Sequence, residues 1–169
     1  MTALPQFIQI EPVGQCNLRC QMCPIQFPAL RELQLQGLGE PLMHPRFFDM
    51  VHYAVERGID VAVNTNMTLV TPRAAQACVE SGLARLHASV DGATRETYER
   101  IRKQSNFDHV IRNLHRLVAA RRRIGVNHPF IEIVVVAMRQ NIDELPALVT
   151  LAAQTGADAV SVQHLCHAF

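Results

Sequence analysis

The sequence of 169 residues has no large excess of charge of either sign: 16 Lys and Arg balance 15 Asp and Glu, and the formal net charge is +1. Proteins that bind nucleic acid over a wide surface need a strong positive field, so this composition argues against a nucleic-acid partner. The one dense basic run, Arg121 to Arg123, ends a predicted helix. We expect it to be solvated there, because positive charge is favourable at a helix C-terminus.

Long apolar runs are also missing. No stretch approaches the ~20 apolar residues that cross a bilayer. The first residues, MTALPQFIQIEP, have neither the basic start nor the apolar segment of a secretory signal. We therefore expect no membrane segment and a cytoplasmic location. With 49% apolar residues and ordinary amounts of Gly and Pro, the composition is typical of one globular domain, residues 1–169, with a substantial core.

The five cysteines do not form the pattern of a disulfide framework, because three of them lie within eight residues. Cys16, Cys20 and Cys23 occur in the segment GQCNLRCQMCP, directly after a predicted strand. In a reducing compartment such a cluster indicates a metal site. The spacings C-x3-C and C-x2-C allow one short loop to turn all three sulfurs toward a common centre.

Strand-like and helix-like apolar periods alternate along the chain, which predicts a parallel sheet covered by helices, with the working site at the carboxyl ends of the strands. The predicted strands cover residues 6–12, 32–37, 60–65, 85–90, 130–138 and 159–165. The predicted helices cover residues 45–58, 71–82, 94–102, 107–123 and 142–156. Only about twenty residues separate the first two strands, too few for a crossover helix beside the Cys loop. We therefore expect that the first crossover helix is missing and that the chain is a fragment.

Three thiolates admit two kinds of metal site. A structural zinc site needs a fourth ligand, for which His44, Cys78 and Cys166 are candidates. Cys78 has the spacing of a buried apolar residue on a helix, and His44 that of a loop residue. His164, Cys166 and His167 form HLCH near the end of the chain, either by chance or as a lining of the sheet's mouth. The second kind is a [4Fe–4S] cluster with three thiolate ligands, which leaves one iron open to a small ligand.

The Cys spacing after a first strand resembles the radical S-adenosylmethionine (radical SAM) superfamily. In that family the open iron binds the amino and carboxylate groups of SAM. The resemblance implies that Cys16, Cys20 and Cys23 hold a [4Fe–4S] cluster and serve catalysis through it. It also implies an α/β fold, a partial (β/α)6 TIM-like barrel with parallel strands and, here, without its first crossover helix.

Further segments match the family in order and position. GLGEP resembles the GGEP motif that binds the SAM amino group, NTNMT the TNG segment, and SVDG a segment near the SAM carboxylate and ribose. An arginine in YERIRK matches one that pairs with the carboxylate, and the last two strands match those that contact the adenine. The SAM-binding residues implied in this way are Gly37, Gly39, Glu40, Pro41, Asn64, Thr65, Ser89, Asp91, Arg102, Val136 and Gln163.

The resemblance also implies an activity. The reduced cluster would donate an electron to SAM, the S–C5′ bond would break, and the 5′-deoxyadenosyl radical would abstract a hydrogen atom from a substrate. Flavodoxin or ferredoxin is the implied electron donor. The SVDG version and the Asn141 region resemble most the SPASM or twitch branch, whose C-terminal cluster domain is absent here and which often modifies peptides. A peptide substrate is therefore favoured, and a small molecule stays open.

Two other functions fit the same residues. The first is a non-enzymatic metalloprotein that binds zinc or an electron-transfer cluster through the thiols and a fourth ligand. The second is a degenerate homologue that binds SAM weakly and serves as an interaction module. Only the radical SAM hypothesis requires that one metal coordination position be left open by the protein.

Overall fold

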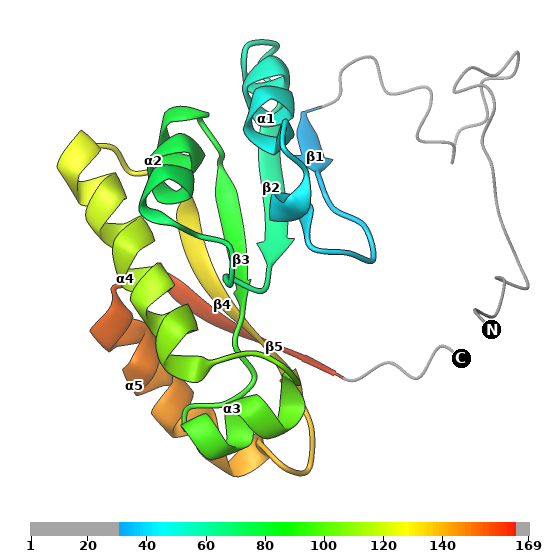
Figure 1. Ribbon diagram of the computed structural model, residues 1–169, viewed down its shortest axis with the longest axis vertical. Helices are drawn as coiled ribbons and strands as arrows, with labels where there is room; N and C mark the ends of the chain where they lie inside the picture. The colour runs from blue at the N-terminus through cyan, green and yellow to red at the C-terminus, as the bar shows by residue number, and fades with distance from the viewer. Residues whose placement is uncertain (1–30, 165–169) are drawn as a thin grey trace, which may run out of the picture. The chain divides into compact units, whose positions relative to one another are not determined.

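The computed structural model describes residues 31–164, which contain one parallel sheet of five strands (Figure 1). The strands follow one another across the sheet in chain order, and each pairs in parallel with the next. They are β1 (Glu32–Gln34), β2 (Asp60–Thr65), β3 (Arg85–Ser89), β4 (Phe130–Ala137) and β5 (Ala159–His164). This confirms the predicted α/β class with parallel strands. The predicted first strand, residues 6–12, and the Cys cluster lie outside the described residues.

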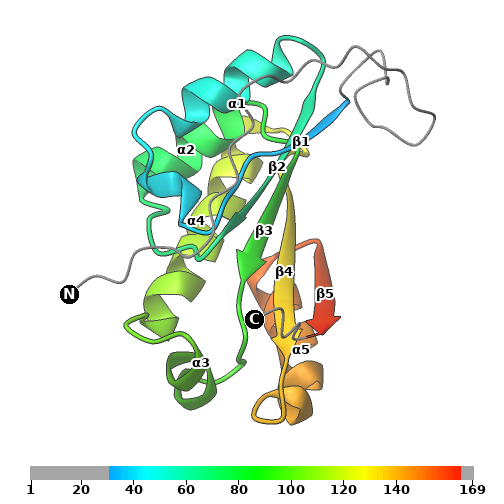
Figure 2. The same cartoon turned by 90° about the vertical axis from the view of Figure 1, so that its right-hand side faces the viewer.

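Helices connect successive strands, and α1, α2 and α4 lie on the same face of the sheet (Figure 2). The helices are α1 (Phe47–Val55), α2 (Pro72–Glu80), α3 (Arg95–Ile101), α4 (Phe107–Ile124) and α5 (Leu145–Thr155), with short 3-10 turns η2 (Pro41–Met43) and η3 (Ile142–Glu144). The side chains of Thr71, Thr94 and Asn106 cap the N-termini of α2, α3 and α4 by accepting a backbone N–H. Within residues 31–164, no helix combines the length and the apolar character that crossing a membrane requires.

Two predicted boundaries differ from the structure. The helix expected to start at Ile142 begins at Leu145, because Pro146 lacks a backbone N–H and fits only the first turn of an α-helix. The strand expected to reach Gly37 ends at Gln34. Beyond it, the Gln36 side chain accepts a hydrogen bond from Asn64 N at 2.9 Å and so replaces a backbone partner in the ladder.

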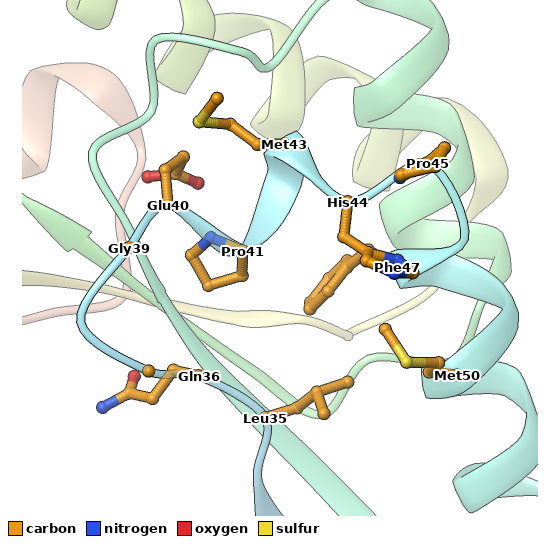
Figure 3. Close-up of a pocket in the computed structure, with 11 residues that line it drawn as sticks. Leu35, Gln36, Gly39, Glu40, Pro41, Met43, His44, Pro45, Phe47 and Met50 are labelled. Carbon is orange, nitrogen blue, oxygen red and sulfur yellow. The ribbon is translucent and has the colours of Figure 1, made fainter. Parts of the chain in front are cut away.

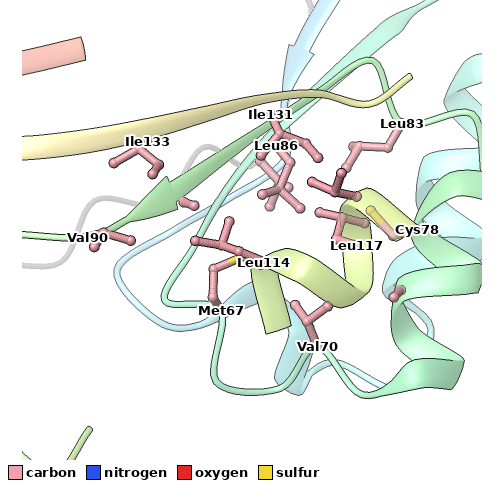
Figure 4. Close-up of a cluster of buried hydrophobic side chains, with 14 of the residues drawn as sticks. Met67, Val70, Cys78, Leu83, Leu86, Val90, Leu114, Leu117, Ile131 and Ile133 are labelled. Carbon is pink, nitrogen blue, oxygen red and sulfur yellow. The ribbon is translucent and has the colours of Figure 1, made fainter. Parts of the chain in front are cut away.

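The core lies between the sheet and the helices α1, α2, α4 and α5, and Figure 4 shows part of it. Leu114 and Leu117 from α4 meet Leu86 from β3 and Ile131 from β4, and each is at most 1% exposed. Cys78 from α2 is in the same cluster, and burial raises the pKa of its thiol to about 12. The prediction that Cys78 is a buried apolar residue is therefore confirmed.

The prediction that the basic run is solvated is wrong for Arg121. Its side chain is only 12% exposed and forms an ion pair with Asp158. Arg121 also donates a hydrogen bond to Pro129 O at 2.9 Å, so it joins α4 to the segments that precede β4 and β5. Arg122 and Arg123 are exposed, as expected.

Candidate functional site

A cavity of about 280 Å³ lies at the carboxyl ends of β1, β2 and β3. It is lined by Gln36, Gly37, Leu38, Gly39, Glu40, Asn64, Thr65, Asn66, Ser89 and Arg102. The structure thus brings together most of the residues that the sequence indicated for SAM: Gly37, Gly39, Glu40, Asn64, Thr65, Ser89 and Arg102. In parallel sheets, ligands bind at this edge because the loops after successive strands converge there.

Glu40 joins the loop after β1 to the loop after β2. One of its carboxylate oxygens accepts a hydrogen bond from Thr65 Oγ1, and the other accepts one from Asn66 N, both at 2.7 Å. The first oxygen also accepts from Leu42 N at 3.2 Å, at the start of η2. With both oxygens bonded to protein donors, Glu40 fixes the shape of the glycine loop.

The two glycines of this loop are not required by the packing of the described residues. A Cβ atom built at Gly37 or Gly39 meets no heavy atom within 4 Å, and neither residue has the positive φ that favours glycine. Leu38 between them is fully exposed. The loop therefore presents bare backbone beside the cavity, an arrangement that lets a ligand approach the main chain closely.

Arg102 lines the cavity and is held from behind by Asp91. Asp91 is 2% exposed, and its carboxylate accepts hydrogen bonds from Arg102 Nε at 2.6 Å and from Val136 N at 2.7 Å. Because Asp91 is bonded to Nε, the two Nη groups of the Arg102 guanidinium are left for other acceptors. A guanidinium held in this way is suited to bidentate binding of a carboxylate.

Two predicted residues therefore lie behind the cavity rather than on its wall. Asp91 and Val136 are absent from the lining and contact each other at the ends of β3 and β4. Asn141 is 1% exposed and lies in the interior. Its side-chain amide donates hydrogen bonds to Asp91 O and to Val136 O, each at 2.9 Å. The Asn141 region was singled out in the sequence only for its resemblance to the SPASM or twitch branch, and these two hydrogen bonds were not predicted.

Glu144 was also overlooked, and it holds the other end of α3. Its carboxylate accepts hydrogen bonds from Ala93 N at 2.7 Å and from Thr94 Oγ1 at 3.0 Å. Burial by itself would raise the pKa of Glu144, but hydrogen bonds from Thr97, Ala93 and Thr94 outweigh it and lower that pKa. The segment from Ala93 to Arg102 is therefore anchored at both ends.

Other predicted residues lie elsewhere. Pro41 and His44 line a neighbouring, largely apolar cavity of about 470 Å³ between the glycine loop and α1 (Figure 3). Gln163 is exposed on β5, next to Val136 in the sheet register. Three predicted metal ligands, Cys16, Cys20 and Cys23, lie outside the described residues, as do Cys166 and His167.

Candidate fourth metal ligands can be placed only within residues 31–164. In this part of the chain, no three His, Cys, Asp or Glu residues are close enough to hold a metal ion together. His44 is exposed, and its Nδ1 accepts a hydrogen bond from Arg46 N at 3.2 Å. Cys78 is enclosed by the core. Neither belongs to a metal-binding group in the described region.

Comparison of the sequence with known proteins gives the family of this chain. The profile of the radical SAM superfamily matches residues 34–152. The "Tungsten-containing aldehyde ferredoxin oxidoreductase cofactor-modifying protein" of Pyrococcus furiosus is 28% identical over 188 residues, 95% of this chain and 51% of that protein. The mycofactocin maturase MftC of Mycobacterium tuberculosis is 34% identical over 72% of this chain and 29% of its own length. This chain thus spans about half or less of these relatives.

A solved structure shows the same fold. The structure of Streptococcus suis SuiB bound to S-adenosylmethionine superposes with a TM-score of 0.67 at 15% identity, over 81% of this chain and 30% of that one. SuiB has also been solved with a precursor peptide, SuiA, bound. The family is one of enzymes that use SAM and a [4Fe–4S] cluster. Since its profile covers most of the sequence, this chain belongs to the radical SAM superfamily.

Proposed function

We propose that this chain is the core of a radical SAM enzyme that binds SAM in the cavity at the ends of β1, β2 and β3. The observation that carries the proposal is the convergence of the glycine loop, Asn64, Ser89 and Arg102 on one cavity of about 280 Å³. These residues come from four separate segments of the chain. Their convergence supports a common ligand better than any single motif does.

The donor groups around the cavity fit the amino-acid part of SAM. The Nη groups of Arg102 are suited to the carboxylate, because Nε is already bonded to Asp91. The backbone of Gly37 to Gly39 is suited to the ammonium group, since a Cβ atom at either glycine would meet nothing within 4 Å and the main chain is therefore open to close approach. Asp91 and Val136 contribute through Arg102, whose orientation they fix. Contacts of Pro41, Val136 and Gln163 with the ligand stay predictions.

The second part of the proposal is the cysteine cluster, which would hold the metal group. Cys16, Cys20 and Cys23 supply three thiolates, the donor type and number that a [4Fe–4S] cluster with one open iron needs. When bound, that cluster supplies the electron for the reductive cleavage of SAM, which is chemistry that no side chain can perform. The chain's own residues bind SAM and orient it. We propose flavodoxin or ferredoxin as the electron donor and a cytoplasmic location.

We also propose that residues 1–169 are a single, incomplete radical SAM domain. The alignment with the P. furiosus relative runs over 188 residues, more than the whole length of this chain, so it includes positions at which this chain has no residue. We propose that the first crossover helix is among these positions. A peptide substrate is supported by the likeness to SuiB, which binds a precursor peptide.

The proposed function is tested by anaerobic reconstitution with iron and sulfide, followed by electron paramagnetic resonance (EPR) of the reduced protein with and without SAM. We expect a cluster signal that shifts when SAM is added, and formation of 5′-deoxyadenosine. Cys20→Ala should abolish the formation of 5′-deoxyadenosine while residues 31–164 keep their fold. A protein with one bound zinc and no cluster, or a cluster signal indifferent to SAM, would contradict the proposal.

A further inference from the structure

A row of polar side chains crosses four strands directly beside the SAM cavity. Gln34 of β1, Asn64 of β2, His87 of β3 and Glu132 of β4 lie on one face of the sheet, in adjacent register positions for the last three. Asn64 Oδ1 is 2.7 Å from His87 Nδ1, and His87 Nε2 is 3.3 Å from Glu132 Oε2. Of the four residues, only Asn64 lines the cavity.

A backbone amide fixes the direction of the hydrogen bonds that join Gln34, Asn64 and His87. Asn64 N–H donates to Gln36 Oε1 at 2.9 Å, so the Gln36 atom is an oxygen and its second partner, Gln34 Nε2 at 2.8 Å, is a donor. Gln34 Nε2 also contacts Asn64 Oδ1 at 3.2 Å, so this Asn64 atom is an acceptor. It follows that His87 Nδ1 carries a proton and donates it to Asn64 Oδ1.

This assignment determines what Asn64 can offer to a ligand. Its carbonyl oxygen accepts from both His87 and Gln34, so its amide Nδ2–H₂ group is left for the cavity. If the amide turned over, an N–H group would face two donors. The histidine therefore selects a donor, rather than an acceptor, at this part of the cavity wall.

Glu132 holds the imidazole in this orientation. With Nδ1–H bonded to Asn64, the opposite nitrogen of His87, Nε2, faces the Glu132 carboxylate at 3.3 Å. The two side chains are 21% and 24% exposed, so they are partly desolvated. Partly buried ion pairs contribute little to stability on balance, because desolvation offsets their attraction. Stability alone is therefore a weak reason for this pair.

We propose that His87 and Glu132 are a positioning pair that orients Asn64, so that its Nδ2–H₂ group donates a hydrogen bond to an acceptor atom of the bound SAM. The inference rests on the proposed function, because SAM is the ligand concerned. His87 and Glu132 act through Asn64 and need not contact SAM themselves.

The test measures SAM dissociation constants on the reconstituted protein by calorimetry, and the Asn64 and His87 side chains by ¹⁵N NMR. Asn64→Asp keeps an acceptor for His87 and Gln34 but replaces the donor toward the cavity by a second oxygen. We expect it to weaken SAM binding at least tenfold. His87→Ala should weaken binding about fivefold, shift the Asn64 amide resonances, and add nothing in the Asn64→Asp background.

Two further variants separate positioning from simple loss of structure. His87→Asn places an amide nitrogen where Nδ1 lies, so it should restore most of the affinity that His87→Ala loses. His52→Ala removes the histidine of another His–Glu pair, also 3.3 Å apart but exposed on α1, and should leave the affinity unchanged. Additive effects of Asn64→Asp and His87→Ala, or unchanged affinity in both, would overturn the inference.

Failure of the proposed function has a different signature. If the unsubstituted protein does not bind SAM, the proposed function is wrong, and the role assigned to Asn64 toward SAM is wrong with it. The hydrogen-bond row would still give a His87 ring with a proton on Nδ1 and an Asn64 amide that responds to His87→Ala. If SAM binds but the ring carries no proton on Nδ1, only the positioning pair is overturned.

Discussion

Arg102 is bonded to Asp91 through Nε, at 2.6 Å, and this leaves its Nη groups for a ligand. The carboxylate is 3% exposed, whereas the guanidinium side chain is 30% exposed, so the pair runs from the interior to the cavity. A buried carboxylate that also accepts from Val136 N cannot move with the arginine. The direction of the guanidinium is therefore set by the sheet.

Replacing Arg102 by lysine should weaken SAM binding about 10- to 100-fold. A single ammonium group cannot pair with Asp91 and also bind a carboxylate in a bidentate way, and hydrogen bonds to charged groups contribute roughly 1.5–3 kcal/mol. Titration of the reconstituted protein with SAM measures the change. Arg100→Lys is the matched control, because Arg100 lies on α3 and is absent from the cavity lining. Equal affinity of the Arg102→Lys variant and the unsubstituted protein would contradict the role of the guanidinium fork.

Alanine at Gly92 of SVDG should affect stability, whereas alanine at Gly39 of GLGEP should affect SAM binding. At Gly92, a Cβ atom would lie 2.6 Å from Tyr98 N and 2.9 Å from Tyr98 Cα, both backbone atoms of α3. We expect Gly92→Ala to lower the free energy of unfolding by about 2 kcal/mol, because α3 must shift. At Gly39 a Cβ atom meets nothing within 4 Å. Gly39→Ala should keep the unfolding midpoint and weaken SAM binding; urea unfolding and calorimetry together distinguish the two. The pattern would be refuted by a destabilised Gly39→Ala variant or a stable Gly92→Ala variant.

Stability should depend on pH through Asp158. Burial by itself would raise the pKa of this carboxyl, but hydrogen bonds from Arg121 and Ile131 N and the charge of Arg121 outweigh it and lower the pKa below its ordinary value of 3.8. A group with a lowered folded-state pKa stabilises the fold above its ordinary pKa, and the contribution is lost as the pH falls through the folded-state pKa. Asp158→Asn should therefore cost about 2 kcal/mol near pH 7.

Urea unfolding at several pH values measures this cost. The difference between Asp158→Asn and the unsubstituted protein should stay constant down to about pH 5 and shrink below pH 3.8. Asp108→Asn is the control, since the Arg95–Asp108 pair is about half exposed on both sides and should contribute less than about 1 kcal/mol. A difference that grows as the pH falls would be incompatible with this account.

Cys78 should resist alkylation in the folded protein. Its thiol is in the core and has a pKa raised to about 12, so the reactive thiolate is scarce at pH 8. Mass spectrometry after a short treatment with iodoacetamide should find Cys78 unmodified without urea and fully modified in urea. Rapid modification of the native protein would mean that α2 opens readily from the sheet.

Much of the fold is predictable from the sequence because buried residues recur at the spacing of a strand or of a helix. The apolar run at residues 130–138 predicted β4, and Thr71 followed by Pro72 marked the start of α2. The end of β1 was not predictable, since it depends on Gln36 bonding to a strand 28 positions away. Side-chain bonds of this kind leave no periodic trace.

The candidate site was predictable only in part, for the same reason. The motifs located the cavity wall, because each follows a strand and the strands are parallel. They did not indicate that Glu40 bonds to Thr65 and Asn66, or that Asp91 lies behind Arg102. The pairing of His87 with Glu132 depends on the register of β3 and β4, which lie 45 positions apart in that register. Such contacts can be identified only when the pairing of the strands is known.

Because the strands follow chain order across the sheet, a nascent chain completes the walls of the cavity long before it completes their support. All lining residues have been synthesised by Arg102, yet Val136, which clamps Asp91, arrives more than thirty residues later. A polypeptide cut between these two points would possess every wall group and hold its arginine loosely. Among the described residues, β4 adds no group to the cavity lining, yet it supplies the N–H group that holds Asp91 behind Arg102.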